Sequence, residues 1–492
     1  MEPIPGVEIR LPPAGSHHLL RELHRQLRDA ILDGRLKPSL RLPPTRTLAA
    51  ALGVSRNTVL AAYDLLLGEG YAIGRPGAGT YVATVLPRRQ ESRRGSGTRQ
   101  DRLNPTWRVP VAAPALLRDT PVRFDLRLGT PDLSPFPADI WRRLTMRAVR
   151  DLGRAPAAYA EPEGRPALRE AIARHTAFAR AVACGPDDIV VTAGAQQAFD
   201  LLARILVVPG QTVVAVEDPG YPPLRQAFAA AGGRLVPVPV DVEGLMVERL
   251  PPDAGIVCVT PSHQFPLGVT LSAARRAALI NFARSRGALV IEDDYDGEFR
   301  FGGRSLDALQ TLDGDEAVFY VGTFSKSLFP ALRLGFVAAP AWARPALTAA
   351  KKAADWHCPV VEQNTLAAFI AEGHLARHVR RMRGIYARRR AVLLEALVRH
   401  GGGLLEPIPS EAGLHLAAWL AAPQDAEAIV ARAAADGVAV EPLGRYTVAG
   451  SGRSGLALGY GACPTERIDE AIARLVRAIN DTSTSQQRPP VR

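Results

Sequence analysis

Residues 322–335 read G-T-F-S-K-S-L-F-P-A-L-R-L-G and contain Lys326, one of only four lysines in a chain with 56 arginines. Arginine serves equally well as surface charge, so a lysine retained in such a composition can have a role that a guanidinium cannot fill. The main such role is nucleophilic, because an amine can lose its proton and form a Schiff base. An ordinary surface lysine is the alternative, and the surrounding sequence decides between them.

Short apolar runs alternate with helical patterns on both sides of this stretch. The runs lie at residues 189–191, 212–216, 255–259, 288–291 and 318–321. This alternation predicts a largely parallel α/β sheet that is covered on both faces. Because ligands of such sheets bind at the carboxyl ends of the strands, the residues that follow each run are the candidates for a site.

Polar residues follow four of these runs. A-G-A-Q-Q-A opens a helix at Ala195 and Gln196, where free amides favour a phosphate. Tyr221 ends E-D-P-G-Y, and five acids stand in E-D-D-Y-D-G-E-F-R. The last run leads to Lys326 and, seven residues later, to Arg333. Neighbouring acids repel one another unless a cation lies beside them. A metal site is therefore the alternative for the acids, but the sequence places no histidine near them.

A phosphate site, an aromatic ring, a carboxylate and an amine are together the groups that pyridoxal phosphate requires. Their order and spacing resemble the fold-type I aminotransferases. The resemblance implies that Lys326 forms the Schiff base with the cofactor and that Asp293 pairs with the pyridine nitrogen. It also implies cofactor contacts by Tyr295 at the phenolic oxygen, by Tyr221 on the ring, by Ala195, Gln196, Thr323, Ser325 and Arg333 at the phosphate, and by Tyr159 from a second subunit.

Two positions depart from the aminotransferase pattern. Phe265, in H-Q-F-P-L-G, stands where related enzymes have the asparagine of N-P-x-G, which touches the cofactor oxygen. A-L-G-Y, at residues 457–460, stands where many have an arginine that binds the substrate carboxylate. These departures predict at most weak transaminase activity. Arg445, with Arg453 behind it, is the remaining candidate for binding the carboxylate of an effector.

Most of the positive charge lies at the N-terminus. Residues 1–122 hold 18 Lys and Arg against 10 Asp and Glu, in a chain of 492 residues with a net charge of +11. Three short helical patterns are followed by a glycine-rich hairpin, at residues 18–32, 46–52, 56–67 and 71–82. Ser55 can cap the third helix, whose first turn leaves Arg56, Asn57 and Thr58 exposed.

Residues 41–71 read R-L-P-P-T-R-T-L-A-A-A-L-G-V-S-R-N-T-V-L-A-A-Y-D-L-L-L-G-E-G-Y, and G-A-G-T-Y-V follows. This pattern resembles the winged helix-turn-helix of GntR-type regulators, over residues 14–83. It implies that Arg46 and Arg56 contact double-stranded DNA with support from Thr58, and that the wing tip at Gly77 approaches the minor groove. A protein-interaction module of three helices is the alternative, but it needs neither the wing nor these arginines.

Residues 84–121 lack apolar periodicity and are rich in Arg, Ser, Gly and Pro, which predicts a flexible linker to an aminotransferase-like domain at 122–482. The joined architecture resembles the MocR subfamily of GntR regulators, which implies a homodimer that can pair head-to-tail. No signal-peptide pattern and no apolar run of about 18 residues occur, so we expect a cytoplasmic protein. Four scattered cysteines without a C-x-x-C predict neither a zinc site nor a disulfide framework.

Three functions are compatible with these parts. The first is a transcription factor whose operator binding responds to an amino acid, an amine or pyridoxal phosphate itself. The second is a working aminotransferase with an appended DNA-binding domain, and the third is a DNA-binding dimer without cofactor. The set of Lys326, Asp293, Tyr295 and Arg333 argues against the third function, and the two departures argue against the second. We therefore predict the first.

Overall fold

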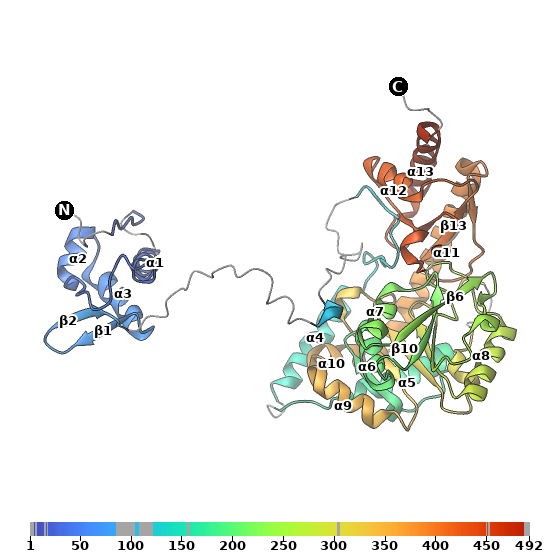
Figure 1. The fold of residues 1–492 in the computed structure, drawn as a ribbon, viewed down its shortest axis with the longest axis horizontal. Helices are drawn as coiled ribbons and strands as arrows, with labels where there is room; N and C mark the ends of the chain where they lie inside the picture. The colour runs from blue at the N-terminus through green and yellow to red at the C-terminus, as the bar shows by residue number, and fades with distance from the viewer. Residues whose placement is uncertain are drawn as a thin grey trace. The chain divides into compact units, whose positions relative to one another are not determined.

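The computed structural model describes residues 4, 7–13, 16, 18–84, 104–107, 122–154, 158–302, 306–448, 450 and 453–486. The chain divides into two compact units, Met1–Pro110 and Val111–Arg492, each with a hydrophobic core of its own (Figure 1). The predicted linker falls between the two cores. Apart from residues 84 and 104–107, it lies outside the described residues. No helix in the described part of the chain is long and apolar enough to cross a membrane.

The N-terminal unit contains a helix-turn-helix and a hairpin. Its elements are α1 (Leu19–Leu32), α2 (Thr45–Leu52), α3 (Arg56–Gly68), β1 (Ala72–Arg75) and β2 (Gly79–Val82). Leu27 and Val59 are completely buried, on the apolar stripes of α1 and α3. Gly53 ends α2 with a left-handed φ of 63°, and the Ser55 hydroxyl accepts a hydrogen bond from the Thr58 amide at 3.0 Å. The predicted winged helix-turn-helix is confirmed.

A sheet of eight strands lies at the centre of the large unit, in the order β4-β11-β10-β9-β8-β5-β6-β7. The strands are β4 (Ile189–Thr192), β5 (Val213–Asp218), β6 (Arg234–Asp241), β7 (Gly244–Leu245), β8 (Ile256–Val259), β9 (Leu289–Asp294), β10 (Val318–Thr323) and β11 (Gly335–Ala338). Strands β10, β9, β8, β5 and β6 are parallel to one another, as predicted. β11 is antiparallel to both of its neighbours, which allows it to follow β10 without a crossover helix.

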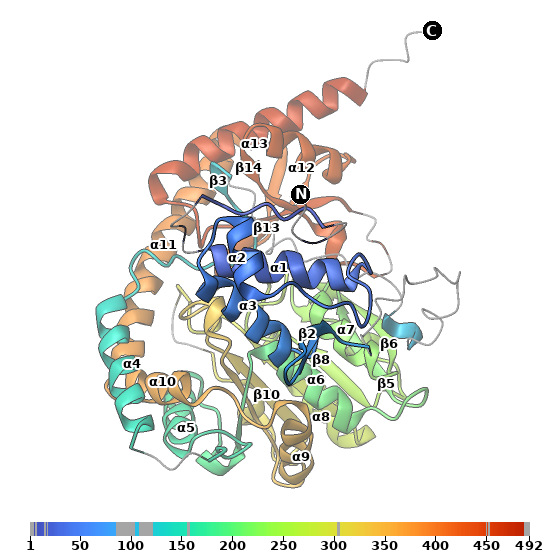
Figure 2. The ribbon, with the colours of Figure 1, turned by 90° about the vertical axis from the view of Figure 1, so that its left-hand side faces the viewer.

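Helices cover both faces of this sheet because successive strand residues point to opposite sides. Val214 and Val216 of β5 share a core with Phe199 of α6, whereas Ala215 shares another with Leu279 of α8. The helices around the sheet are α4 (Ala138–Leu152), α5 (Pro166–Arg180), α6 (Ala195–Leu206), α7 (Pro222–Ala230), α8 (Ala273–Arg286), α9 (Arg344–Asp355) and α10 (Val360–Ala371). α10 packs against both α4 and α5 (Figure 2). The sheet is therefore buried on both faces, and its strand ends are left for a site.

The C-terminal part of the large unit forms a smaller lobe. Its antiparallel sheet has the order β12-β13-β16-β15, and β14 pairs with β3 beside it. These strands are β3 (Phe124–Asp125), β12 (Leu405–Pro407), β13 (His415–Leu420), β14 (Val438–Ala439), β15 (Glu441–Pro442) and β16 (Gly455–Gly459), and the helices are α11 (His374–Gly401), α12 (Ala426–Ala435) and α13 (Thr465–Gln486). The long α11 packs along α13 (Figure 2). Below, this part of the large unit is called the C-terminal lobe.

Candidate functional site

The acidic motif lies in the sheet rather than after it. β9 continues through Glu292 and Asp293 to Asp294, beyond the apolar run, and Asp293 stands beside Val321 of β10 in parallel register. All three acids are buried. Burying a carboxylate is costly unless it is hydrogen-bonded or paired with a charge, so the partners of each acid reveal its role.

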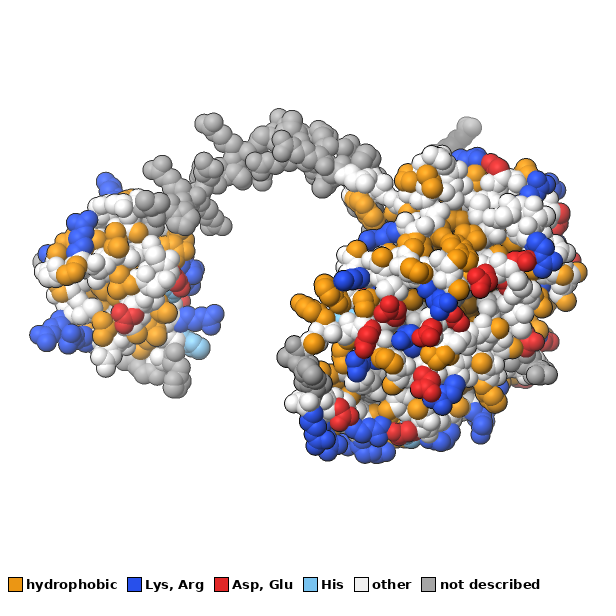
Figure 3. Space-filling view, turned by 90° about the horizontal axis from the view of Figure 1, so that it is seen from below, with side chains coloured by type: hydrophobic (Ala, Val, Ile, Leu, Met, Phe, Trp, Pro, Cys, Tyr) orange, Lys and Arg blue, Asp and Glu red, His pale blue; other side chains and the backbone are white. Residues whose placement is uncertain are grey.

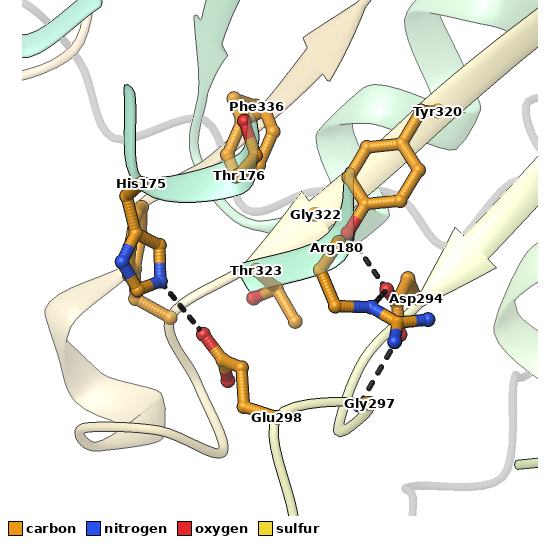
Figure 4. Close-up of a pocket in the computed structure, with 11 residues that line it drawn as sticks. His175, Thr176, Arg180, Asp294, Gly297, Glu298, Tyr320, Gly322, Thr323 and Phe336 are labelled. Atoms are coloured by element: carbon orange, nitrogen blue, oxygen red, sulfur yellow. Dashed lines mark hydrogen bonds and ion pairs between the residues drawn. The ribbon is translucent and has the colours of Figure 1, made fainter. Parts of the chain in front are cut away.

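Two of these acids have complete sets of partners. Glu292 accepts hydrogen bonds from two backbone amides of the 3-10 helix Leu309–Leu312, at 2.8 and 2.9 Å. Asp294 accepts hydrogen bonds from Arg180 Nε at 2.6 Å and from the Tyr320 hydroxyl at 2.7 Å (Figure 4). Arg180 is therefore the cation that the acidic cluster required. It is itself buried, at 3% exposure.

A small cavity lies beside this ion pair. His175, Arg180, Asp294, Glu298 and Tyr320 are among the residues that line its volume of about 20 Å³ (Figure 4). That volume holds about one water molecule. The cavity is therefore too small for an organic cofactor, and the site described below lies elsewhere at the strand ends.

The fourth acid of the motif, Asp296, pairs with a histidine. Its Oδ2 lies 2.9 Å from His263 Nδ1, and both side chains are 1% exposed. The expectation that no histidine lies near the acids was wrong. The two residues are 33 positions apart in the chain, and the fold brings them together.

Asp293 is the acid without a partner. It is 4% exposed, and its Oδ1 accepts no hydrogen bond from any described residue. Burial, and then the neighbouring Asp294 and Glu217, raise the pKa of Asp293 well above its usual value, while Lys326 acts in the opposite direction. A buried carboxylate in this state gains stability from a cationic hydrogen-bond donor. Asp293 is thus available to a ligand, unlike the three acids around it.

Lys326 lies half-buried just after β10. Its Nζ donates a hydrogen bond to the Gly129 carbonyl at 2.7 Å. Desolvation lowers the pKa of Lys326, although Asp296 and Asp293 oppose the shift. The amine is therefore more easily neutral, as a nucleophile must be. Gly129 has a φ of 75°, and a Cβ there would lie 2.7 Å from Nζ, so this position requires glycine. Nothing in the sequence singled it out among 43 glycines.

The phosphate candidates converge at the start of α6. Gly194, with a φ of 79°, precedes the helix, and a Cβ on it would lie 3.0 Å from the Arg333 guanidinium. Arg333 also donates to the Ala193 carbonyl at 2.6 Å. Gly335 of β11 lies between the ends of β4 and β10, because a Cβ there would be 3.0 Å from Gly194 Cα. The first amides of α6, at Ala195 and onward, have no partner within the helix and can bind an anion.

Three more of the predicted phosphate contacts lie nearby along the chain. Thr323 ends β10, and its hydroxyl donates to the Ser325 hydroxyl at 3.0 Å. Gln196 is exposed on the first turn of α6, and its side chain donates to the Pro223 carbonyl at 3.3 Å. The strand end and the helix start thus offer two hydroxyls, backbone amides and a guanidinium around one edge of the sheet.

Aromatic rings lie near the unpaired acid and the phosphate candidates. The rings of Tyr221 and Phe265 meet edge to face at 5.2 Å, and Phe265 contacts Tyr295 in the same way at 6.1 Å. Burial, followed by Asp293, raises the pKa of Tyr221 to about 12, while Arg333 opposes the shift. Tyr221 therefore lies within the electrostatic influence of both the unpaired acid and the phosphate candidates. Phe265 adds an apolar face where aminotransferases carry an amide.

The remaining predicted residues of the large unit lie farther out. Tyr159 is 78% exposed and stacks on Trp356 at 4.8 Å. Arg445 donates to Glu427 at 3.2 Å, and Arg453 pairs with Glu406. Both of these arginines belong to the C-terminal lobe. Arg445 lies in the 3-10 helix Leu443–Tyr446, whose Tyr446 meets Phe265 edge to face at 5.0 Å.

The N-terminal unit exposes the residues expected to contact DNA. Arg46, Arg56 and Asn57 are exposed, whereas Thr58 is half-buried with its hydroxyl 2.8 Å from that of Ser55. Gly77 is exposed at the tip of the wing with a φ of 74°. Figure 3 shows Lys and Arg side chains standing out from this unit.

Sequence reasoning missed two further arginines near the wing. Arg41 lies beside the wing residue Gly79, because a Cβ there would be 3.2 Å from its Nε. Arg75 lies over the Tyr81 ring at 4.6 Å. Arg41 pairs with Tyr81 in an isolated β-bridge, a contact between residues 40 positions apart that no local pattern predicts.

Comparison with known proteins agrees with both units. A family model for aminotransferase class I and II matches residues 128–475, and one for bacterial regulatory proteins of the gntR family matches residues 19–82. The chain is 36% identical to the probable rhizopine catabolism regulatory protein MocR of Rhizobium meliloti, over 95% of each chain. It is 35% identical to the HTH-type transcriptional regulator TauR of Rhodobacter capsulatus, over 97% of this chain and 99% of TauR.

A solved structure extends the likeness to the fold of the large unit. The crystal structure of LysN, an alpha-aminoadipate aminotransferase from Thermus thermophilus complexed with N-(5'-phosphopyridoxyl)-L-leucine, matches with a TM-score of 0.68 and 29% identity. The match covers 74% of this chain and 93% of LysN. The large unit therefore has the fold of a pyridoxal phosphate-dependent aminotransferase.

The residues present fit this cofactor. Asp293 is a buried carboxylate with an unpartnered oxygen, Lys326 is a half-buried amine of lowered pKa, and α6 begins with free amides beside Arg333. Pyridoxal phosphate is the cofactor of the large unit. The N-terminal unit is a GntR-type DNA-binding domain. With both domains matched over nearly its whole length, the chain belongs to the MocR-type transcriptional regulators of the GntR superfamily.

Proposed function

We propose that this chain is a DNA-binding transcriptional regulator whose large unit binds pyridoxal phosphate and responds to an amino acid, an amine or the cofactor itself. The response is a change in affinity for operator DNA. The observation that carries this proposal is the unpaired Asp293 near Lys326, in a site where Phe265 replaces the aminotransferase asparagine. The site keeps what binds the cofactor and lacks a group that an efficient transaminase uses.

Each predicted residue then has a defined task. Pyridoxal phosphate supplies an aldehyde that a neutral amine can attack and a ring that withdraws electrons. Lys326 would hold the cofactor through its amine, and Asp293 would accept a hydrogen bond from the ring nitrogen and keep it protonated. The remaining contacts would be Tyr295 at the phenolic oxygen, Tyr221 on the ring, Ala195, Gln196, Thr323, Ser325 and Arg333 at the phosphate, and Tyr159 from a second copy.

An effector carboxylate requires a free guanidinium. Arg445 is our candidate because its 3-10 helix also carries Tyr446, which contacts Phe265. At 3.2 Å its present partner is Glu427, which is exposed, so exchanging that partner for an effector carboxylate costs little. Arg453 is the second candidate and would have to leave Glu406.

A homodimer, which can pair head-to-tail, would connect the effector site to DNA. The exposed Tyr159 and Trp356 pair supports this proposal, because such rings are available to a second copy. An effector can shift DNA affinity only by its differential affinity for two conformations, typically about 1–3 kcal/mol. We place the protein in the cytoplasm, where both operator DNA and the cofactor are available.

The test is an absorption titration combined with DNA binding. We expect the purified chain to develop a visible absorption band with pyridoxal phosphate, which Lys326→Ala loses and the control Lys352→Ala keeps. Candidate amino acids should change the band and the affinity for operator-region DNA without forming keto acid. Rapid keto-acid formation would instead make the protein an aminotransferase. Absence of a band in the unmutated chain would contradict the assignment of Lys326.

A further inference from the structure

A line of hydrogen-bonding groups leads away from the cofactor site. The Tyr295 hydroxyl lies 3.0 Å from His263 Nδ1, and this same nitrogen lies 2.9 Å from Asp296 Oδ2. Tyr295 is half-buried and faces Phe265, whereas His263 and Asp296 are almost completely buried behind it. Tyr295 has a proposed role at the cofactor, but His263 and Asp296 have none so far.

The position of the proton on His263 determines what Tyr295 can do. Nε2 of His263 is buried and has no partner among the described residues. A buried N–H without an acceptor is rarer than a bare acceptor, so the proton belongs on Nδ1, where Asp296 accepts it. Nδ1 then cannot accept a hydrogen bond from Tyr295. The tyrosine oxygen can only accept from Nδ1, which leaves its own O–H to point elsewhere.

Tyr295 keeps this proton. Burial, and then the charges of Asp296 and Asp293, raise the pKa of Tyr295 well above its usual value. The hydroxyl is therefore a donor throughout the physiological range, and its donor direction is set by the histidine behind it. A tyrosine that is free to rotate would offer either its proton or a lone pair to the site.

His415 and Gly413 of the C-terminal lobe pack against His263. The His415 ring packs against that of His263 with a tilt of 48° and 4.6 Å between the ring centres, and its pKa lies well below the usual value because of burial and then the neighbouring His263. Gly413 leaves the necessary space, since a Cβ there would lie 2.1 Å from His263 Cε1. Water is thus kept away from the histidine, which strengthens its hydrogen bonds.

We propose that His263 and Asp296 are positioning residues that hold Tyr295 as a fixed hydrogen-bond donor to the phenolic oxygen of pyridoxal phosphate. This inference rests on the proposed contact between Tyr295 and the cofactor. A donor at this point stabilises negative charge on the phenolic oxygen, so it affects both the affinity for the cofactor and its visible absorption.

The same three side chains, His263, Asp296 and His415, also bring possible metal ligand atoms within 4.8 Å of one another. Hydrogen bonds already use one nitrogen of each histidine and the carboxylate of Asp296. Nδ1 of His263 faces Asp296, and Nε2 of His415 lies 3.2 Å from the Pro266 carbonyl. We therefore favour the hydrogen-bonded line, and metal analysis of the purified protein tests the choice. One equivalent of bound metal would overturn the proposal.

A double-mutant cycle on the full chain provides the main test. Affinity for pyridoxal phosphate is measured by absorption for the unmutated chain, Tyr295→Phe, His263→Phe and the double variant. We expect each single variant to bind about tenfold more weakly with a shifted band, and the double variant to bind no more weakly than Tyr295→Phe. Asp296→Asn should retain most of the affinity, because its amide oxygen still accepts the Nδ1 proton.

A second histidine variant guards against a folding defect. His263→Gln can pair with both Asp296 and Tyr295, but its carbonyl would accept the tyrosine proton, so weaker cofactor binding is again expected in a folded protein. Unchanged affinity in both His263 variants, or losses that multiply in the double variant, would overturn the proposal. If the unmutated chain shows no saturable binding, the proposed function and this inference fail together. If the unmutated chain binds pyridoxal phosphate and the His263 variants bind it equally well, only the positioning role of His263 and Asp296 is contradicted.

Discussion

Arg46 and Arg56 of the N-terminal unit differ from the buried arginines of the large unit in how their charge is used. In the N-terminal unit, Arg46 and Arg56 are exposed, and within the described residues neither forms an ion pair. In the large unit, Arg180, Arg276 and Arg389 are 3–7% exposed, and each donates to carbonyl or carboxylate oxygens of the protein. An unpaired guanidinium in water is available to phosphate, whereas a buried one must be bonded within the fold. A composition rich in arginine therefore does not by itself indicate nucleic-acid binding.

The largest effect is expected from removing a buried arginine. Arg180→Met leaves Asp294 buried without its cation, so the large unit should lose about 3–5 kcal/mol of unfolding free energy. Urea unfolding followed by tryptophan fluorescence measures this, because four of the five tryptophans lie in the large unit. The control Arg142→Ala removes an exposed ion pair with Asp139 and should change stability by at most about 1 kcal/mol. Equal losses of unfolding free energy in Arg180→Met and Arg142→Ala would contradict the proposed difference between buried and exposed arginines.

Sequence periodicity predicted a largely parallel α/β sheet because periodicity is a local property. The apolar runs predicted five of the parallel strands, the residues after them indicated the candidate stretches, and the resemblance to aminotransferases singled out Asp293 and Lys326 within them. β11 was not predicted, since its four residues follow the lysine stretch without a separating helix. The acids of β9 were expected after the strand, but the strand extends through them, and Glu292 and Asp294 have their partners inside the fold.

Long-range pairs limited what the sequence could predict. Arg180 and Asp294 are 114 positions apart, and His263 and Asp296 are 33 apart, so no local pattern connects them. The sequence suggested that a cation or a metal must accompany the acids, but only the fold shows which acid has which partner. The functional meaning of Asp293 follows from this, because it is the acid left over.

Glu292 is a buried acid whose hydrogen-bond partners include no arginine, so it shows what burial does to a carboxyl group. Glu292 relies on two backbone amides, and burial followed by the charge of Asp294 raises its pKa from 4.5 to about 7. The folded state therefore binds this proton more tightly than the unfolded state does. The contribution of Glu292 to stability is highest below the unfolded pKa and falls as pH rises from 4.5 to about 7.

The measurement compares the unmutated chain with Glu292→Gln in urea between pH 5 and pH 8. The variant cannot ionise at this position. The free energy of unfolding of the unmutated chain should therefore fall by up to about 3 kcal/mol relative to that of the variant as pH rises. The sign of the slope is the decisive result. A relative stability that rises with pH would mean that the amides of Leu309 and Gln310 stabilise the charged form more than burial opposes it.

The smallest effect on stability is expected at Arg56, an exposed arginine of the N-terminal unit. Arg56 stands on the first turn of α3 without an internal ion-pair partner among the described residues, so Arg56→Ala should leave the stability of the N-terminal unit nearly unchanged. Operator binding should weaken by about 1–3 kcal/mol if the guanidinium reads a base, with a matching loss of sequence preference. If it contacts only phosphate, all DNA should bind more weakly and the salt dependence should decrease by about one charge. Arg142→Ala, an equally cationic change on the large unit, serves as the control in the same fluorescence-anisotropy titration. A similar loss of DNA affinity in that control would show that total charge, rather than the position of Arg56 on α3, determines binding.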